Sequence, residues 1–426
     1  MNLYLFNDNY SAAVFGIGTY LKELVCALKG SGIKIHIVHL HAMRQIFEIE
    51  KIDDPELNSG ENWYIPDVRS ENSLADTFQN IEAYSRNVLY LLRLYIRDTE
   101  KLVFHFNFNQ YQWLAKELKT VFDCKTIATL HCSKWSIDLC GNISLLHTMK
   151  SKPEDQRSPY EQLLLSKDEY ASFLFKEVDR IIALSQHQKN FLYSEYQLDP
   201  EKVSVIPNGL SAEIDNGQWT IDNEATDHAP LLRKKWHLSD KECLILFAGR
   251  LDAVKGLVFL IRAFREVLAK LPNCRLIIAG SGNYDVYLKE AKDICAKIVF
   301  TGQLERKALY ELYRMVDVGI VPSLYEPFGY VAVEMMMHAL PVVSTATSGL
   351  NEVVDDNCGL KIPVIEQSDK VEIDTGLLAE KILYLLQHPE EARKMGGNGR
   401  KRYEKLFTSE IFGRNMVNFY QSLFKQ

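Results

Sequence analysis

The chain of 426 residues has few cysteines, and no two of them stand in a C-x-x-C spacing. Its eight cysteines lie mostly inside apolar runs, as at Cys243, so we expect reduced core thiols and no disulfide or metal framework. No stretch approaches ~18 uninterrupted apolar residues, and no early basic residue precedes the short apolar run at the N-terminus. We therefore expect neither a membrane span nor a signal peptide, but a soluble, cytoplasmic protein.

An excess of positive charge is also lacking. The chain has 49 Lys and Arg against 56 Asp and Glu, a formal net charge of −7. This balance argues against a protein held on nucleic acid mainly by phosphate contacts. A hydrophobic content of 47% suffices for each of about two to four domains to bury its own core.

Short apolar runs alternate with longer stretches of helical periodicity in two parts of the chain. Such alternation is typical of an α/β protein whose helices cover both faces of a parallel sheet. In the first part the expected strands are Asn2–Phe6, Ile33–Val38, Leu102–Phe106, Thr126–Leu130, Arg180–Leu184 and Val203–Ile206. In the second part they are Cys243–Ala248, Arg275–Ala279, Lys297–Phe300, Val318–Val321 and Pro341–Ser344.

A polar segment separates the two parts. Residues 211–240 lack an apolar period, and we predict that they run over the surface as a connection. The expected domains are therefore a Rossmann-like domain over residues 1–210 and a second one over 211–408. The apolar spacing of Ser409–Phe424 predicts a final amphipathic helix, and we expect residues 409–426 to pack back on the first domain.

Loops that directly follow the predicted strands are the places to look for a site, because open α/β sheets bind ligands beyond the carboxyl ends of their strands. The loop after the first strand contains Gly16 and Gly18, where a helix begins. Glycine allows close approach of a backbone, and helix-start N–H groups favour an anion. A tight strand-to-helix turn explains the same two glycines equally well.

The loop after Cys243–Ala248 carries two cations, Arg250 and Lys255, together with Gly249 and a helix-opening Gly256. A guanidinium fork and an ammonium point charge together suit a diphosphate. A surface lysine or an ion-paired arginine would explain either residue alone. Their combined placement favours a phosphate site.

A further loop, over residues 322–334, also runs from a strand end into a helix. Glu326 and Glu334 offer acceptors for pairs of sugar hydroxyls, and Gly329 and the residues after it supply N–H groups for a phosphate. Because this helix is apolar nearly all round, we expect Glu334 to be buried and to need a ligand or a hidden cation as its partner.

A single histidine, His131, follows a strand of the first part. A lone histidine is more often a structural residue, but a position at a strand end favours a site. We interpret His36, His39 and His105 as structural.

These motifs stand in a fixed order along the chain: Phe-Gly-Ile-Gly-Thr-Tyr, Val-Ile-Pro-Asn-Gly, Gly-Arg-Leu-Asp-x-x-Lys-Gly, Ala-Gly-Ser-Gly and Glu-Pro-Phe-Gly-x-x-x-x-Glu. The set closely resembles the retaining glycosyltransferases of family 4, over nearly the whole chain and most specifically over residues 244–354. The resemblance implies the GT-B fold, in which two Rossmann-like domains with parallel sheets face an interdomain cleft.

The resemblance also implies a role for each matching residue. Arg250 and Lys255 would neutralise the donor diphosphate, and Glu334 would accept hydrogen bonds from the ribose hydroxyls. Glu326, with the backbone of Phe328 and Gly329, would hold the transferred sugar. His131 matches the family's sugar-contacting histidine and completes a catalytic set with Arg250, Lys255 and Glu326. The other expected donor-binding residues are Gly16, Gly249, Gly280, Gly282, Leu304, Tyr330 and Val331.

The implied activity is the transfer of a sugar from a nucleotide-diphosphate sugar, with a UDP-sugar as the first expectation. The acceptor would be a glycan, a lipid-linked molecule or a peptide, and polysaccharide biosynthesis is the default for the family. The resemblance implies that the anomeric configuration is retained. No D-x-D triplet occurs, which agrees with fixed cations in place of a metal, so we expect no metal and no cofactor besides the donor. A catalytically silent nucleotide-sugar sensor or partner subunit stays open, as does another GT-B activity such as a phosphorylase or an epimerase.

Basic residues Arg86, Arg93, Arg97 and Lys101 recur near helical spacing beside leucines. A basic amphipathic helix at the inner membrane surface would have this pattern. We favour the alternative, a domain helix that packs its apolar face on the sheet.

Overall fold

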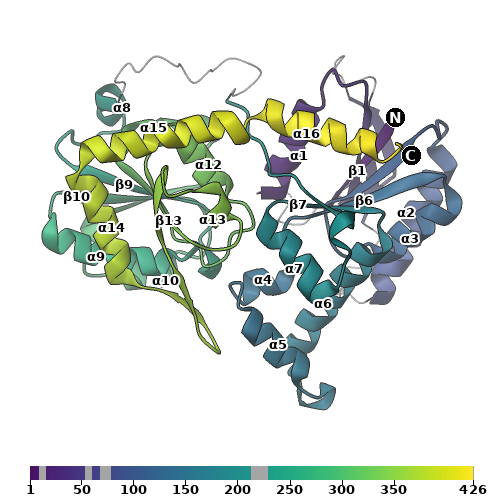
Figure 1. The fold of residues 1–426 in the computed structure, drawn as a ribbon, viewed down its shortest axis with the longest axis horizontal. Coiled ribbons are helices and arrows are strands. Elements are labelled where there is room, and N and C mark those ends of the chain that lie inside the picture. Colours follow the sequence, from purple (N-terminus) through teal and green to yellow (C-terminus); the bar gives the residue numbers. More distant parts are fainter. Residues whose placement is uncertain (9–15, 53–59, 68–77, 213–228, 426) are drawn as a thin grey trace. The chain divides into compact units, whose positions relative to one another are not determined.

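The computed structural model describes residues 1–8, 16–52, 60–67, 78–212 and 229–425, and it divides into two compact units (Figure 1). The first unit comprises Met1–Lys134, Met149–Gly209 and Ser409–Gln426, and the second comprises Trp135–Thr148 and Leu210–Thr408. Residues 135–148 thus group with the second unit, although the sequence division placed them in the first. The reason is local: the Asn142 amide donates to the backbone carbonyls of Gln367, at 2.7 Å, and Lys370, at 3.4 Å.

The first unit contains an eight-stranded sheet in the order β3-β4-β2-β1-β5-β6-β7-β8. All its pairs are parallel except β3 with β4 at one edge. The sequence did not predict these two strands. β3 is only four residues long and mostly charged, whereas β4 has an alternation of buried Trp63 and Ile65 that was not recognised. The strands are β1 (Asn2–Asp8), β2 (Lys34–Ala42), β3 (Glu48–Lys51), β4 (Glu61–Pro66), β5 (Leu102–Phe106), β6 (Cys124–Leu130), β7 (Arg180–Ala183) and β8 (Val203–Val205).

Helices cover both faces of this sheet, as the alternation along β5 shows. Phe104 and Phe106 point into a hydrophobic cluster with α2, α3 and α6, whereas His105 between them bonds the Tyr420 hydroxyl of α16 at 2.8 Å. On that second face α16 packs against α1. The helices are α1 (Gly16–Ala27), α2 (Phe78–Tyr95), α3 (Gln112–Val121), α4 (Lys134–Asp138), α5 (Ile143–Ser151), α6 (Pro159–Glu177), α7 (Gln186–Tyr196) and α16 (Ser409–Ser422).

The second unit contains a six-stranded, fully parallel sheet in the order β11-β10-β9-β12-β13-β14, plus an antiparallel hairpin of β15 and β16. The five predicted strands are present, while β14 and the hairpin, which are short and half-exposed, were missed. The strands are β9 (Cys243–Ala248), β10 (Cys274–Ala279), β11 (Ile298–Gly302), β12 (Val318–Val321), β13 (Val342–Thr345), β14 (Gly359–Ile362), β15 (Val364–Glu366) and β16 (Val371–Ile373).

Helices also cover both faces of the second sheet (Figure 1). Phe247 and Ile278 pack on one face with α9 and α14, while Gly319 of β12 faces Met335 of α12 on the other. Helix α8 lies inside the segment 211–240, where no helix was predicted. The helices are α8 (Ala229–Lys235), α9 (Leu257–Lys270), α10 (Asp285–Glu290), α11 (Arg306–Met315), α12 (Tyr330–Met337), α13 (Leu350–Val353), α14 (Thr375–Gln387) and α15 (Pro389–Leu406).

The cysteines are free thiols, but they are not all core residues. Cys274 and Cys358 are buried, whereas Cys26 and Cys295 are exposed, so the prediction of core positions is wrong for the last two. Cys26 lies on the exposed side of α1, between buried Leu24 and Leu28, and Cys295 begins a short 3-10 turn. Among the helices that the structure describes, none has the length and apolar character needed to cross a bilayer.

Two adjacent glycines in α15 give a matched test of close packing. A Cβ at Gly396 would lie 1.9 Å from the carbonyl oxygen of Ala339, whereas one at Gly397 would meet no described atom within 4 Å. We expect Gly396→Ala to destabilise the protein by about 1–3 kcal/mol, because α15 must move away from its neighbour. Gly397→Ala should be neutral or stabilising by up to ~1 kcal/mol through helix propensity. Thermal unfolding of both variants checks this, and equal midpoints would contradict it.

Candidate functional site

Three loops of the second unit meet at the carboxyl edge of its sheet, after β9, β10 and β12. Backbone hydrogen bonds join them: the Leu251 N–H donates to the Ser281 carbonyl at 2.9 Å, and the Leu324 N–H donates to the Val254 carbonyl at 2.8 Å. Because β9 lies between β10 and β12, the loop with both predicted cations is held on each side by a neighbour. The fold therefore brings the two polar loops predicted for this unit into one place, together with the loop of Gly280 and Gly282 that the resemblance implied.

Glycines make this close packing of loop backbones feasible. Gly280 has φ +155°, and a Cβ there would lie 1.7 Å from the carbonyl oxygen of Gly249. Gly282, at φ +153°, is similarly close to the Leu251 carbonyl, at 2.5 Å. Packing of the protein alone thus requires glycine at positions 280 and 282, whatever ligand the loops hold.

The two loops after β9 and β12 contribute an ion pair of opposite charges. The Lys255 ammonium lies 2.5 Å from a carboxylate oxygen of Glu326, and the side chains are 21% and 15% exposed. The Ser323 hydroxyl donates to the same oxygen at 3.4 Å. The Ser348 hydroxyl donates to the Glu326 carbonyl at 2.7 Å, which also fixes the backbone of this glutamate. Two of the four predicted catalytic residues are therefore in direct contact.

Arg250 has a carboxylate beside it as well. Its guanidinium lies 3.0 Å from Asp252, and both side chains are about one-third exposed. The ion-paired arginine that the sequence left as an alternative is thus present in the ligand-free protein. A pair this exposed contributes little to stability, so its cation can turn to an anionic ligand at small cost.

Helix α12 begins in the third loop and presents backbone donors. Gly329 precedes it with φ 105°, a left-handed conformation that favours glycine, and Phe328 is buried against the Phe407 ring. The N–H groups of Tyr330 and Val331 belong to the first helical turn, where no carbonyl of the helix can accept from them. The positive end of the helix dipole adds to this preference for an anion.

Glu334 lies one turn further along α12, and its environment differs from the prediction. The helix is buried, but Glu334 itself is only half-buried, and the Tyr313 hydroxyl of α11 donates to its carboxylate at 2.8 Å. Burial and the nearby carboxylate raise the pKa of Tyr313 well above its ordinary value, so the hydroxyl stays a donor. Tyr313 is therefore one protein partner of the Glu334 carboxylate. Periodicity indicates the buried face of α11, but no sequence signal pairs Tyr313 with Glu334.

The loop after β11 carries Leu304. Gly302 ends the strand with φ +74°, and its carbonyl accepts from the N–H of Gly280 at 2.9 Å. Leu304 is half-buried two residues further on. The loop of Leu304, one of the expected donor-binding residues, therefore adjoins the loop that contains Gly280 and Gly282.

In the first unit, Gly16 is the first residue of α1 and is exposed. A Cβ at this position would meet none of the described atoms within 4 Å, so packing among the described residues does not explain this glycine. The preceding Val14 and Phe15 of the same motif lie outside the described residues.

His131, directly after β6, is buried and neutral. Burial lowers its pKa to about 3, and Nε2 lies 3.1 Å from Oδ1 of Asn107. The Asn107 amide nitrogen donates to the Phe6 carbonyl at 3.2 Å, so its oxygen faces the histidine and Nε2 carries the proton. Nδ1 is then the acceptor nitrogen of the ring. Asn107 follows β5 directly, and the sequence offered no signal for its contact with His131.

Two family models match the chain, and together they cover most of it. The model described as Glycosyltransferase Family 4 matches residues 14–214, and the model described as Glycosyl transferases group 1 matches residues 229–402. The second match contains every predicted site residue except Gly16 and His131, which lie in the first.

Two related proteins are similar to this chain over part of their own length. An uncharacterized glycosyltransferase of Methanocaldococcus jannaschii, MJ1607, is 32% identical over 250 residues, 53% of this chain and 59% of that protein. A GDP-mannose-dependent monoacylated alpha-(1-6)-phosphatidylinositol monomannoside mannosyltransferase of Corynebacterium glutamicum is 29% identical over 254 residues, 58% of this chain and 63% of that protein. The matches thus span about three-fifths of these relatives.

Solved structures share the fold over the whole chain. Sucrose-phosphate synthase of Thermosynechococcus elongatus superimposes with a TM-score of 0.75 at 21% identity, covering 100% of this chain and 99% of that one. Anabaena HepE, solved with UDP and glucose, gives a TM-score of 0.67 at 15% identity, covering 99% and 100%. The prediction of an α/β protein of the GT-B class is confirmed. The chain therefore belongs to the family 4 glycosyltransferases, and the group 1 model matches residues 229–402 in its second half.

Proposed function

We propose that the protein transfers a sugar from a nucleotide-diphosphate sugar to an acceptor, with retention of configuration and without a metal ion, in glycan or polysaccharide biosynthesis. The observation that carries this proposal is the contact between Lys255 and Glu326, because it places a cation for the leaving phosphate and an acceptor for sugar hydroxyls 2.5 Å apart. Both lie in the region that the glycosyltransferase group 1 model matches.

The proposed catalysis is mainly electrostatic. Glycosyl transfer passes through an oxocarbenium-like state while negative charge gathers on the leaving diphosphate. Lys255, Arg250 and the N–H groups of Tyr330 and Val331 would stabilise that charge as it develops, which lowers the barrier more than it strengthens ground-state binding. These fixed positive groups would do the work that a divalent cation does at other diphosphates.

The other residues would position the donor. Glu334, oriented by the Tyr313 hydroxyl, would accept from the ribose hydroxyls. Neutral His131 would accept a hydrogen bond from a sugar hydroxyl through Nδ1. Gly16 would allow a phosphate or sugar to approach the start of α1 closely. The absence of described atoms around a Cβ at Gly16 supports that role. Gly249, Gly280, Gly282 and Leu304 would shape the nucleotide floor.

The donor is expected to be a UDP-sugar, but the relatives use more than one base. The C. glutamicum relative is named for GDP-mannose, whereas HepE was solved with UDP and glucose. A first test therefore offers the purified protein UDP-, GDP- and ADP-sugars and follows nucleotide release with and without EDTA.

We expect one donor to be used, EDTA to have no effect, and Glu334→Ala to weaken donor binding roughly ten- to a hundredfold, as loss of charged hydrogen bonds costs about 1.5–3 kcal/mol. Glu380→Ala, which removes an exposed glutamate of α14, is the matched control. Inhibition by EDTA would overturn metal independence. Binding without any turnover would favour the silent sensor or partner subunit, and a product formed without acceptor would indicate an epimerase.

Retention could also arise from a carboxylate nucleophile, with Glu326 attacking the sugar. Glu326 is engaged by Lys255 and Ser323, which supports a role in positioning the sugar and attack of the acceptor on the same face that the phosphate leaves. We expect Glu326→Gln to slow transfer by one to two orders of magnitude without changing the anomeric configuration of the product. Mass spectrometry of a trapped reaction checks the mechanism: a glycosyl group on Glu326 would refute it.

We propose that α2 is a helix of the domain that packs on the sheet and does not bind a membrane surface. Val88 and Leu92 of α2 lie in the hydrophobic core, which supports packing on the sheet, and Arg86 pairs with Glu82 at 2.6 Å. Tyr90 and Leu94 of the same helix are exposed. We expect the protein to stay unbound in flotation with neutral liposomes and with anionic ones. Flotation with anionic lipid that is lost in Arg93→Glu would establish a membrane-binding helix instead.

A further inference from the structure

Two cysteines of the second unit lie side by side on neighbouring strands. Cys243 begins β9 and Cys274 begins β10, and the register of these parallel strands pairs the two residues directly. Paired residues of a parallel ladder project their side chains to the same face of the sheet. Cys274 accordingly belongs to the hydrophobic cluster on one face, and Cys243 packs against that cluster.

The spacing of this pair fits a disulfide. Neighbouring strands lie roughly 4.8 Å apart, and a disulfide joins Cα atoms that are about 4.4–6.8 Å apart. On their outer sides, β10 begins to pair with β11 at Leu276 and β9 begins to pair with β12 at Ile245. Both cysteines precede these ladders, so a small twist of the strand starts can bring the two sulfur atoms together while the later pairs stay in register.

The two thiols differ in access to solvent and in reactivity. Cys274 is fully buried, whereas Cys243 is half-buried. Hydrogen bonding with the Cys274 thiol lowers the pKa of Cys243 to about 7, so much of Cys243 is thiolate at neutral pH, and the thiolate is the nucleophilic form. Burial instead raises the pKa of Cys124 to about 12 and that of Cys358 to about 11. Cys243 is therefore the sulfur that reacts first, and Cys274 is the sulfur beside it.

The charges near Cys243 are already matched with each other. Asp317, whose carboxylate opposes a thiolate, is bound by the Arg233 guanidinium at 3.0 and 2.9 Å. The same carboxylate accepts from the Leu244 N–H at 2.6 Å. Because Arg233 favours the Cys243 thiolate while Asp317 disfavours it, the contact with Cys274 has the larger effect on this thiol.

We propose that Cys243 and Cys274 form a redox site that reacts with a hydroperoxide and closes to a reversible disulfide. The Cys243 sulfur attacks one oxygen of hydrogen peroxide, so an S–O bond forms, the O–O bond breaks and one water leaves. The Cys274 sulfur then attacks the resulting sulfenic acid, so the S–S bond forms, the S–O bond breaks and a second water carries away the Cys274 proton. Two thiols are oxidised, and one peroxide is reduced to two waters.

This redox site is separate from the proposed donor site. Strand β9 spans six residues, and at about 3.3 Å per residue Cys243 lies roughly 17 Å from Ala248, where the loop with Arg250 begins. The proposal therefore does not depend on the glycosyltransferase function, and its test needs no donor.

The test treats the fully reduced, folded protein with a small molar excess of hydrogen peroxide at neutral pH. Remaining thiols are then alkylated in denaturant, and mass spectrometry of a digest made without reductant maps each cysteine. The variants are Cys243→Ser, Cys274→Ala and Cys295→Ser, which removes an exposed cysteine of the same unit as the matched control. Because Cys274 is buried, Cys243→Ser keeps the test valid if Cys274→Ala does not fold.

We expect the unchanged protein to lose two of its eight thiols, with the peptides of Cys243 and Cys274 joined, and dithiothreitol to restore both. Cys295→Ser should form the same link, and Cys243→Ser should not. In Cys274→Ala, Cys243 should accumulate as a sulfenic acid that dimedone traps, because its partner sulfur is gone. The proposal is overturned if the link is absent when other cysteines are already oxidised, or if Cys243 of the unchanged protein passes to sulfinic acid without forming it.

Discussion

The backbones of the loops after β9 and β12 touch, and the site depends on this contact. Gly256 makes it feasible, because a Cβ there would lie 1.9 Å from the carbonyl oxygen of Pro322. With the loops fixed at this separation, Lys255 of one reaches Glu326 of the other, and each charge offsets the desolvation of its partner. A diphosphate that draws the ammonium towards itself would release the carboxylate to accept hydrogen bonds from the sugar. In the proposed reaction, donor binding and sugar positioning would thereby be coupled through a single ion pair.

The start of α12 serves both the fold and the proposed chemistry. Its apolar side chains, among them Met335 and Met336, bury the helix, so the position of its first turn is set by the core rather than by a ligand. The N–H groups at the start and the half-buried Glu334 are consequently held in place before any donor arrives. Tyr313 restrains Glu334 further. Such preorganisation is what electrostatic catalysis requires, because no reorganisation energy is then lost during reaction.

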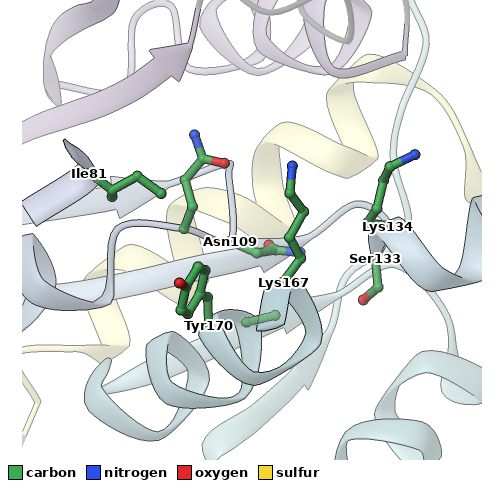
Figure 2. Close-up of a pocket in the computed structure, with 8 residues that line it drawn as sticks. Ile81, Asn109, Ser133, Lys134, Lys167 and Tyr170 are labelled. Carbon is green, nitrogen blue, oxygen red and sulfur yellow. The ribbon is translucent and has the colours of Figure 1, made fainter. Parts of the chain in front are cut away.

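The first unit has a similar division between support and binding. His105 of β5 bonds Tyr420 of α16 and Thr129 of β6, at 2.8 and 2.7 Å, and burial lowers its pKa to about 3. This neutral, fully buried network ties the last helix to the sheet. His131, two residues after Thr129, is held by Asn107 in the tautomer that leaves Nδ1 as an acceptor. The loops that continue from the same two strands line a pocket of this unit (Figure 2).

Elements and site residues differed in how far the sequence could predict them. Buried parallel strands such as β9 and β12 are continuous apolar runs, so their positions were clear from the chain. Strand β3, at a sheet edge, and the hairpin of β15 and β16 are only three or four residues long, and propensity does not distinguish them from loops. Strand β4 has an alternation of buried Trp63 and Ile65 that was not recognised. The site motifs were recognisable because their residues are neighbours in sequence: Arg250 and Lys255 share one loop, and Glu326 and Glu334 share another.

The sequence by itself thus determined the two α/β halves, the polar loops at the strand ends and the family to which they belong, because each is encoded in local pattern. Only the tertiary structure decided which groups meet. Glu326 contacts Lys255 across 71 residues, and Glu334 accepts a hydrogen bond from the Tyr313 hydroxyl across 21 residues. Lys134 and Lys167 share a pocket although they lie on different helices. Such pairs are set by strand order and helix packing, which no short stretch of chain specifies.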